Sequence, residues 1–269
     1  MVYDTINFMN KDKLTFFLKY RWLWVLLLAV PFATIFSNHN LQNFVSTTLI
    51  LYPIGLLFAY DKVRWLALFL LSLLPSFTTS FLLQEHASFS VVSQIVFWFS
   101  LIFAFICSYW IARKAEIIPK ISLRNFPVLK ILLGFLLLFT VSILAGMIGQ
   151  LTKTTTTQNQ TALNQLQTQI PFAIFAAQTI LAGFFEELTY RVGVFEIVLK
   201  KYPKLAFIAA TLLFAFMHGP TDLYSWVLYG CMSLVLTSFY FKYRNFYLNM
   251  SIHMLWNLFS IIVTFLLLR

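Results

Sequence analysis

Two adjacent carboxylates and an arginine stand inside a long apolar stretch, Phe184-Phe-Glu-Glu-Leu-Thr-Tyr-Arg191. If the stretch is helical, Glu187 and Arg191 are four residues apart on one face and can pair in the favoured order, acid before cation. Glu186 points about 100° away from Glu187 and has no partner on its own helix. Burial disfavours the charged form of an unpaired carboxyl, which suits a general base. We therefore expect Glu186 to be catalytic and the ion pair to support it.

Two later apolar stretches carry the other residues that could do chemistry. Phe214-Ala-Phe-Met-His218 places an aromatic ring one helical turn before a histidine. His253-Met-Leu-Trp-Asn257 places a histidine and an asparagine on one helix face. Counted from the basic residues at the ends of their helices, Glu186 and His218 each lie about 14 residues deep, roughly 20 Å. The same count predicts that His253 and Asn257 lie shallower than Glu186.

Together these side chains predict hydrolysis. Glu186 and His218 could share a water molecule and activate it for attack on a peptide carbonyl. His253 and Asn257 could stabilise the oxyanion that forms. Zinc held by Glu186, His218 and His253, with an open fourth position, is the alternative chemistry, although the sequence has no His-Glu-x-x-His motif. The reading without chemistry is a helix–helix ion pair with interhelical hydrogen bonds.

The composition indicates that membrane helices position these residues. Of 269 residues, 60% are hydrophobic and 10% charged, whereas a soluble domain carries about 25% charged residues. We therefore expect an all-α integral membrane protein with about eight or nine spans of ~20 residues each. The net charge of +10 could suggest nucleic acid, but the positive-inside bias of membrane proteins explains it without such a partner. Cys107 and Cys231 show no metal or redox spacing.

Nine apolar segments are predicted to form a polytopic transmembrane helix bundle with a cytoplasmic N-terminus. They cover about residues 22–36, 41–60, 64–84, 88–112, 128–150, 170–199, 204–219, 222–241 and 246–268. In this layout 16 of the 19 Lys and Arg residues lie on the inner side, two on the outer side, and Arg191 within a span. This asymmetry agrees with the positive-inside rule.

The chain is expected to divide at its one long polar stretch, residues 151–169, which we predict to be an outer loop. Residues 1–150 would supply a basic, partly amphipathic surface segment at 1–21, suited to the cytoplasmic membrane surface, and the front transmembrane helices. This front section carries no recognisable motif. Residues 170–269 would form the protease-like transmembrane core that carries all three motifs.

The motifs Glu-Glu-x-x-x-Arg (186–191), Phe-x-x-x-His (214–218) and His-x-x-x-Asn (253–257), in this order on separate apolar helices, resemble those of the CAAX-protease and bacteriocin-processing family. This family, also called Abi, is related to the type II CAAX prenyl endopeptidase and is usually labelled a metalloprotease family. The resemblance covers roughly residues 170–260. It implies that Glu186 and His218 activate water, that His253 and Asn257 form the oxyanion site, and that the Glu187–Arg191 pair supports the helix. Val192 departs from the pattern, since relatives often have Gly there.

The function expected is an intramembrane endopeptidase that acts on a membrane-embedded or lipid-anchored peptide in the lipid bilayer. The family's usual label leaves zinc open as a cofactor. Bacteriocin or signal-peptide processing is its expected setting. The alternative is a bacteriocin self-immunity or partner-binding membrane protein that needs no proteolysis. A proton-coupled transporter would also use membrane Glu and His residues, but the chain shows no repeated halves.

Overall fold

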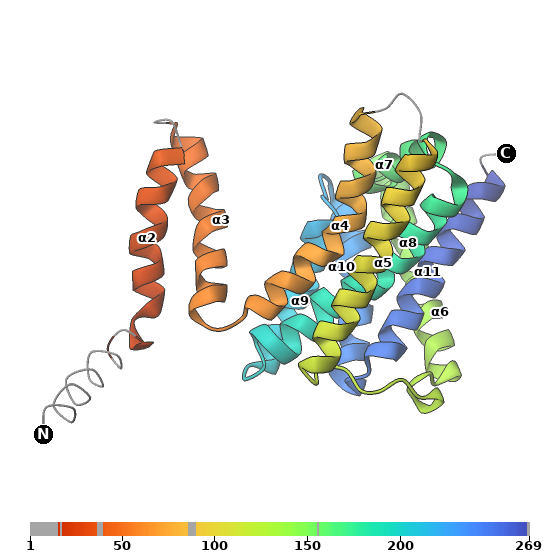
Figure 1. The fold of residues 1–269 in the computed structure, drawn as a ribbon. Helices are drawn as coiled ribbons and strands as arrows, with labels where there is room; N and C mark the ends of the chain where they lie inside the picture. The colour runs from red at the N-terminus through yellow and green to blue at the C-terminus, as the bar shows by residue number, and fades with distance from the viewer. Residues whose placement is uncertain (1–15, 17, 37–39, 86–89, 155, 268–269) are drawn as a thin grey trace, which may run out of the picture. The chain divides into compact units, whose positions relative to one another are not determined.

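The structure is a computed structural model that describes residues 16, 18–36, 40–85, 90–154 and 156–267 (Figure 1). Within these ranges the regular elements are helices and no strand occurs, as the composition predicts. By packing, the chain divides into residues 1–66 and 67–269, and each unit is described by itself. Residues 1–15 and 17 of the predicted basic surface segment lie outside the described residues.

The first unit is a helical hairpin of α2 (Arg21–Phe36) and α3 (Leu41–Ala59). At its open end the guanidinium of Arg21 lies 3.8 Å from the ring centroid of Tyr60 and donates to the carbonyl oxygen of Ala59 at 3.2 Å. Helix α4 (Val63–Glu85) begins at the end of this unit and continues into the second.

The second unit contains the rest of α4 and every motif. Its further elements are α5 (Val91–Lys114), the 3-10 turn η1 (Leu123–Asn125), α6 (Val128–Thr152), α7 (Gln158–Gln169), α8 (Phe172–Glu186), the π-helix η2 (Glu187–Val198), α9 (Pro203–Met217), α10 (Leu223–Tyr243) and α11 (Phe246–Leu267). Helix α11 packs against α8 and α6, and α10 packs against α6 and α9. The three motif-bearing segments therefore share one bundle.

The protein is a multi-pass integral membrane protein. Within the described residues, 7 helical segments are long and apolar enough to cross a membrane, with α8 and η2 together forming one of them. Two further apolar helices, Arg21–Pro31 and Pro203–Met217, are shorter. Each of the nine predicted segments thus contains a helix. Of the two short apolar helices, one ends at Pro31 and the other begins at Pro203.

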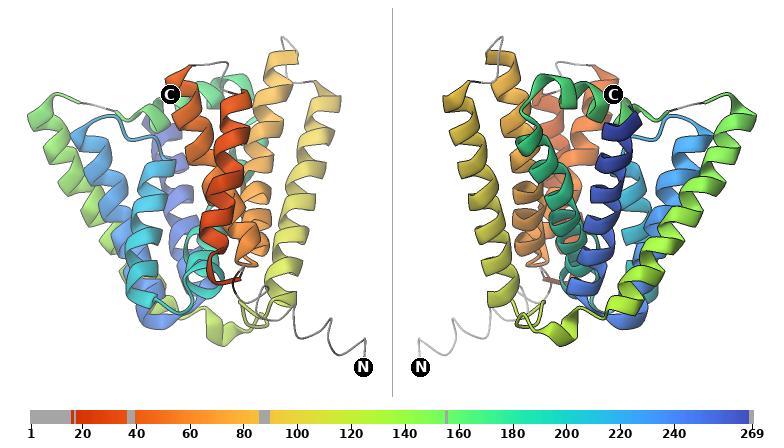
Figure 2. Two further views of the ribbon diagram at one scale, coloured as in Figure 1. Left: turned by 90° about the vertical axis from the view of Figure 1, so that its left-hand side faces the viewer. Right: turned by 90° about the vertical axis from the view of Figure 1, so that its right-hand side faces the viewer.

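Helices α5 and α6 follow each other in the chain but lie at opposite edges of the second unit (Figure 2). The 115–127 connection crosses the end of the bundle between them. This end holds the C-termini of α5 and α10 and the N-termini of α6 and α9. The basic residues at or near these helix ends and in the connection are Arg113, Lys114, Lys120, Arg124, Lys130, Lys204, Lys242 and Arg244. It is the end that the charge pattern predicts to be cytoplasmic.

Small side chains mark the packing faces of these helices. In α5 the buried positions include Ser93, Ser100, Ala104, Ser108 and Ala112, spaced by seven and then by four residues. Lipid provides no hydrophobic drive between helices, so close approach at small residues holds such bundles together. Phe97 and Leu101 are buried beside them. Most of the other large apolar side chains of α5 are exposed, and a membrane would cover them.

The polar stretch 151–169 is not a simple loop, because most of it forms α7. Thr157 begins this helix as an N-cap, and its hydroxyl oxygen accepts a hydrogen bond from the backbone N–H of Gln160 at 3.1 Å. Such a cap satisfies one of the free N–H groups of the first turn. The predicted division into 1–150 and 170–269 stays a prediction about function, since by packing α5 and α6 belong with the motif-bearing helices.

Candidate active site

The two glutamates lie at a change of helix type. Helix α8 ends at Glu186, and the π-helix η2 begins at Glu187. A π-helix closes its hydrogen bonds over one more residue than an α-helix, and it is rare except near functional sites. Because its turn holds more residues, it also rises less per residue. Counting at the α-helical rise from the basic end therefore places Glu186 too deep.

Glu187 is fully buried, and hydrogen bonds from three other side chains reach its carboxylate. The guanidinium of Arg191 donates to Oε1 at 2.9 Å, which confirms the predicted pair. Nδ1 of His253 also lies 2.9 Å from Oε1, and the amide of Asn249 donates to Oε2 at 3.0 Å. A buried charge needs this degree of pairing to be tolerated.

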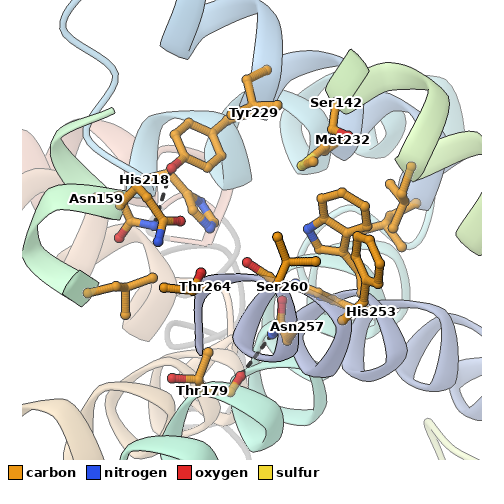
Figure 3. A pocket seen from close by; sticks show the side chains of 18 of the residues that line it. Ser142, Asn159, Thr179, His218, Tyr229, Met232, His253, Asn257, Ser260 and Thr264 are labelled. Atoms are coloured by element: carbon orange, nitrogen blue, oxygen red, sulfur yellow. Dashed lines mark hydrogen bonds between the residues drawn. The ribbon is translucent and has the colours of Figure 1, made fainter. Parts of the chain in front are cut away.

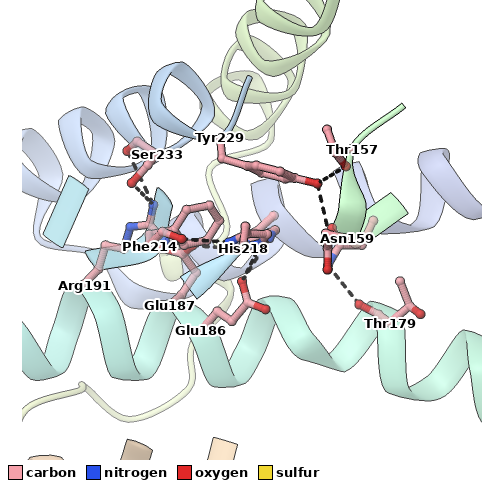
Figure 4. A network of polar contacts seen from close by, with 12 residues as sticks. Thr157, Asn159, Thr179, Glu186, Glu187, Arg191, Phe214, His218, Tyr229 and Ser233 are labelled. Atoms are coloured by element: carbon pink, nitrogen blue, oxygen red, sulfur yellow. Dashed lines mark hydrogen bonds and ion pairs between the residues drawn. The ribbon is translucent and has the colours of Figure 1, made fainter. Parts of the chain in front are cut away.

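Arg191 is held on its other side by α10 and α9. Its second terminal nitrogen donates to Oγ of Ser233 at 3.1 Å. Its guanidinium carbon lies 4.2 Å from the ring centroid of Phe214, a separation typical of cation–π contact. The Phe214 ring also lies beside both histidine rings, at centroid distances of 4.3 Å from His218 and 5.6 Å from His253. The predicted supporting residues thus form one connected layer (Figure 4).

His218 lies at the C-terminal end of α9, and the helix end fixes its tautomer. The backbone N–H of His218 bonds to Ala215 rather than to Phe214, and Gly219 at φ +58° ends the helix. The carbonyl oxygen of Phe214 is therefore available, and it accepts from Nδ1 of His218 at 2.7 Å. Since a carbonyl oxygen only accepts, Nδ1 carries the proton. Nε2 is left to face Glu186, 3.9 Å from its Oε2.

His253 reaches the same carboxylate from α11, so the prediction that it lies shallower than Glu186 is wrong. Its Nε2 lies 3.8 Å from Oε2 of Glu186, while its Nδ1 is bound to Glu187. Besides the π-helix, close packing of α8 and α11 allows this approach. A Cβ atom added to Gly183 would lie 2.9 Å from the backbone nitrogen of Met254, a contact that only glycine avoids.

Oε2 of Glu186 differs from the carboxylate oxygens of Glu187, because it is buried and has no hydrogen-bond partner among the described residues. The two imidazole nitrogens that face it are too distant for direct hydrogen bonds. Polar atoms separated by more than 3.5 Å are commonly bridged by water. A water molecule about 2.8 Å from Oε2 of Glu186 and from Nε2 of His218 could donate one hydrogen to each of them.

Two cavities meet at these residues, with volumes of about 320 Å³ and 230 Å³. His218, His253, Asn257 and Thr179 line both. The larger cavity extends between α6, α10 and α11 and is lined by Leu138, Met232, Trp256 and Phe259, among others (Figure 3). The smaller cavity contains Glu186 and extends towards α4, where Ser72, Ser76 and Gln178 line it. Water and a peptide chain could therefore reach the carboxylate.

Asn257 lies one turn beyond His253 on α11. One amide hydrogen is donated to the carbonyl oxygen of Thr179 at 2.9 Å, which ties α11 to α8 and orients the side chain. This bond uses one of the two amide hydrogens, and the side chain also lines both cavities. The geometry therefore leaves a donor available beside His253.

The positions of Glu186, His218 and His253 decide whether these three predicted ligands could hold a zinc ion. Ligands about 2.0–2.1 Å from a tetrahedral zinc ion lie about 3.4 Å from one another. The separations from Oε2 of Glu186 are 3.9 Å for His218 and 3.8 Å for His253. Across the described parts of the chain, no three His, Cys, Asp or Glu side chains are arranged to hold a metal ion. The residues as placed do not fit zinc, and no step below depends on a metal.

The chain is similar in sequence to known proteins, in one case over nearly its whole length. The chain is 52% identical over 259 residues to the UPF0177 protein YvdC of Lactococcus lactis subsp. lactis (strain IL1403), which covers 96% of this chain and 99% of the relative. The chain belongs to the UPF0177 family. Its residues 168–259 match the family model described as Type II CAAX prenyl endopeptidase Rce1-like. No solved structure matches the chain.

The family match confirms the resemblance inferred from the three motifs, and it covers nearly the same part of the chain, residues 168–259. Helix α8, the π-helix η2, the C-terminal end of α9 and helix α11 of this UPF0177 protein bring together Glu186, Glu187, Arg191, His218 and His253. Asn249 was missed. It lies four residues before His253, as Asn257 lies four after, so the repeated spacing Asn-x-x-x-His-x-x-x-Asn could have indicated it.

Proposed function

We propose that this protein is an intramembrane endopeptidase of the CAAX-protease type that hydrolyses a peptide bond in a membrane-embedded or lipid-anchored peptide. One observation carries the proposal. The unpartnered, buried oxygen of Glu186 faces two imidazole nitrogens whose partner nitrogens are already fixed, one by a helix-end carbonyl and one by Glu187. Oε2 of Glu186 and Nε2 of His218 are two acceptors, and they match the two hydrogens of one water molecule.

In the proposed mechanism, Glu186 takes a proton from the water while the water oxygen attacks the peptide carbonyl carbon. Nε2 of His218 accepts the second hydrogen bond from the water and orients it. The C–N bond then breaks, and the proton held by Glu186 passes to the leaving amine nitrogen. General acid–base catalysis of this kind contributes about 10²–10⁴-fold to rate.

The oxyanion is assigned to His253 and Asn257. Glu187 holds Nδ1 of His253 and so fixes the orientation of the ring, and Nε2 donates to the oxyanion when it carries a proton. Asn257 offers its second amide hydrogen. Donors fixed in advance, in a site with little water, stabilise a developing oxyanion better than mobile ones. Phe214, Glu187 and Arg191 act as support: Phe214 and Glu187 contact the histidines, and Arg191 holds Glu187.

The substrate class follows from where the site lies. Glu186 is in the middle of the Phe172–Val198 membrane segment, and the larger cavity beside it has an apolar and aromatic wall. A peptide that enters must therefore be membrane-embedded or carry a lipid anchor. A bacteriocin or signal-peptide precursor is a substrate of this class.

The test is cleavage by the purified protein in lipid vesicles. The vesicles also contain membrane proteins extracted from Lactococcus lactis, and new N-termini are labelled and identified by mass spectrometry. We expect new termini with the wild-type protein and none with Glu186→Gln or His218→Ala. Glu196→Gln is the matched control, because Glu196 binds Arg244 near the basic end, away from the cavities.

Two results would contradict the proposal. One is a wild-type protein that creates no new termini. The other is a Glu186→Gln protein that creates the same termini as the wild type.

A further inference from the structure

The imidazole of His218 lies between two aromatic rings. Phe214 is one turn earlier on α9, with ring centroids 4.3 Å apart and planes inclined by 35°. Tyr229, from α10, stacks on the other side at 4.5 Å and 29°. The bond from Nδ1 to the Phe214 carbonyl fixes one edge of the imidazole, and the two rings fix its plane. Tyr229 is thus one of the contacts that aim Nε2 at Glu186.

The hydroxyl of the same tyrosine is bound to the start of α7. It lies 2.8 Å from Oγ1 of Thr157 and accepts a hydrogen bond from the amide of Asn159 at 3.3 Å. Thr157 is also the N-cap of α7, as described above, and only 3% of its surface is exposed. The tyrosine therefore holds the end of α7 from which the helix propagates (Figure 4).

Helix α7 forms part of the wall of the site. Asn159 and Leu163 line both cavities, and Gln160 lines the larger one. A continuous series of contacts thus runs from α7 through Tyr229 and His218 to Glu186. Thr157 and Tyr229 are 72 residues apart in the chain, so local sequence does not dictate that they meet.

We propose that Tyr229 is a positioning residue with two separable roles. Its ring sets the plane of His218, and its hydroxyl holds α7 against the cavities. The first role rests on the proposed function for its effect on catalysis, whereas the second concerns the fold alone. Tyr229 lines the larger cavity, but in this assignment it does not contact the water, and it acts through His218 and α7.

Two substitutions separate the roles. Tyr229→Phe keeps the ring and removes the hydroxyl, whereas Tyr229→Leu removes both. The probe for kinetics is an internally quenched peptide copied from the site cut most often in the membrane-extract experiment. The probe for α7 is hydrogen–deuterium exchange of residues 157–169 in the full-length protein in vesicles. Tyr243→Phe and Tyr243→Leu, near the C-terminus of α10, are the matched controls.

For Tyr229→Phe we expect kcat within about twofold of wild type and at least about tenfold faster exchange of residues 157–169. For Tyr229→Leu we expect the same faster exchange and a fall in kcat of at least about tenfold, with KM changed less than threefold. Tyr229→Phe would then keep wild-type kcat while its exchange is fast, whereas Tyr229→Leu would lose kcat as well. General loss of structure would not produce this difference. The Tyr243 controls should change neither readout.

The proposal is overturned if exchange of residues 157–169 in Tyr229→Phe equals that of wild type, or if Tyr229→Leu keeps wild-type kcat. If Tyr229→Leu does not fold, exchange in Tyr229→Phe decides alone. Failure of the proposed function has a different signature. In that case Glu186→Gln cuts as wild type does, while the exchange measurement still tests the contact between Tyr229 and α7.

Discussion

Glu186 and Glu187 are neighbours in the chain, yet the structure surrounds them in opposite ways. Glu187 has 0% of its side chain exposed and receives bonds from an arginine, an asparagine and a histidine. Glu186 has 23% of its side chain exposed, lines a cavity and leaves Oε2 without a partner. One carboxylate is satisfied by the fold, and the other is available for a molecule that enters the cavity.

One short segment of the chain thus supplies both a structural group, Glu187, and a reactive group, Glu186. The backbone changes from α-helix to π-helix between the two residues. Glu187 then points into the layer of Arg191, Ser233 and Asn249, while both histidines turn their free nitrogens towards Glu186. His253 joins the two sides, because each of its nitrogens faces a different glutamate.

The largest expected effect comes from breaking the satisfied side. Arg191→Met leaves the Glu187 carboxylate buried with less compensation, and loss of one partner of a buried pair costs about 3–5 kcal/mol. We expect most of the protein to be lost from the folded, monodisperse fraction in detergent. Arg244→Met is the control, since its partly exposed ion pair with Glu196 should be worth less than about 1 kcal/mol. Equal thermal stability of the two variants would contradict the scaffold role.

Gly183→Ala tests the contact that brings the two sides together. The new Cβ would lie 2.9 Å from the Met254 backbone nitrogen, so α8 and α11 must separate slightly. We expect a loss of about 1–3 kcal/mol in stability, as for other overpacked sites, and at least a tenfold loss of cleavage. Gly146→Ala is the control, because nothing lies within 4 Å of its added Cβ. Wild-type cleavage by Gly183→Ala would show that the close approach is not needed.

Asn249→Ala sharpens the comparison by removing one donor from Glu187. The carbonyl oxygen of Leu236, which also accepts from this amide at 2.7 Å, would lose its bond too. Unsatisfied buried groups cost about 1–3 kcal/mol, and we expect the lower melting temperature to be accompanied by a several-fold fall in cleavage. Asn125→Ala, whose amide donates to a carbonyl at an exposed site, should behave as wild type. A melting temperature equal to that control would remove Asn249 from the scaffold.

The smallest effect is expected from metal removal. The histidine–glutamate separations do not fit zinc, so 1,10-phenanthroline or EDTA should leave the rate of peptide cleavage within about twofold. Rates are compared before and after dialysis against chelator, with metal content measured in both samples. Loss of cleavage that zinc restores would show that Glu186 faces a metal ion rather than a water molecule alone.

Sequence reasoning predicted the helical segments and much of the site, because those features depend on local pattern. Apolar runs of sufficient length indicate membrane helices whatever packs around them. A four-residue spacing indicated the Glu187–Arg191 pair, and it is present. The same reasoning assumed α-helical geometry throughout, so it missed the π-helix and placed His253 too shallow.

The remaining features depend on contacts between distant segments. Asn249 matters because α11 lies beside η2, and Tyr229 matters because it reaches both His218 and Thr157. Neither side chain is unusual within its own helix. The polar composition of residues 151–169 suggested a loop, yet an N-cap and a run of residues that tolerate helix produced α7 over the cavities.

The most direct test compares Glu186→Gln with Glu187→Gln under identical conditions, measuring thermal unfolding and cleavage of the same peptide. We expect Glu186→Gln to unfold within about 1 kcal/mol of wild type, since a change away from a satisfied network costs little, and to lose cleavage by at least about 10²-fold. Glu187→Gln should lose about 3 kcal/mol or more of stability, because Arg191 is then buried without its counter-charge. The opposite pattern, a stable and inactive Glu187→Gln beside an unstable or fully active Glu186→Gln, would contradict the assignment of the two glutamates.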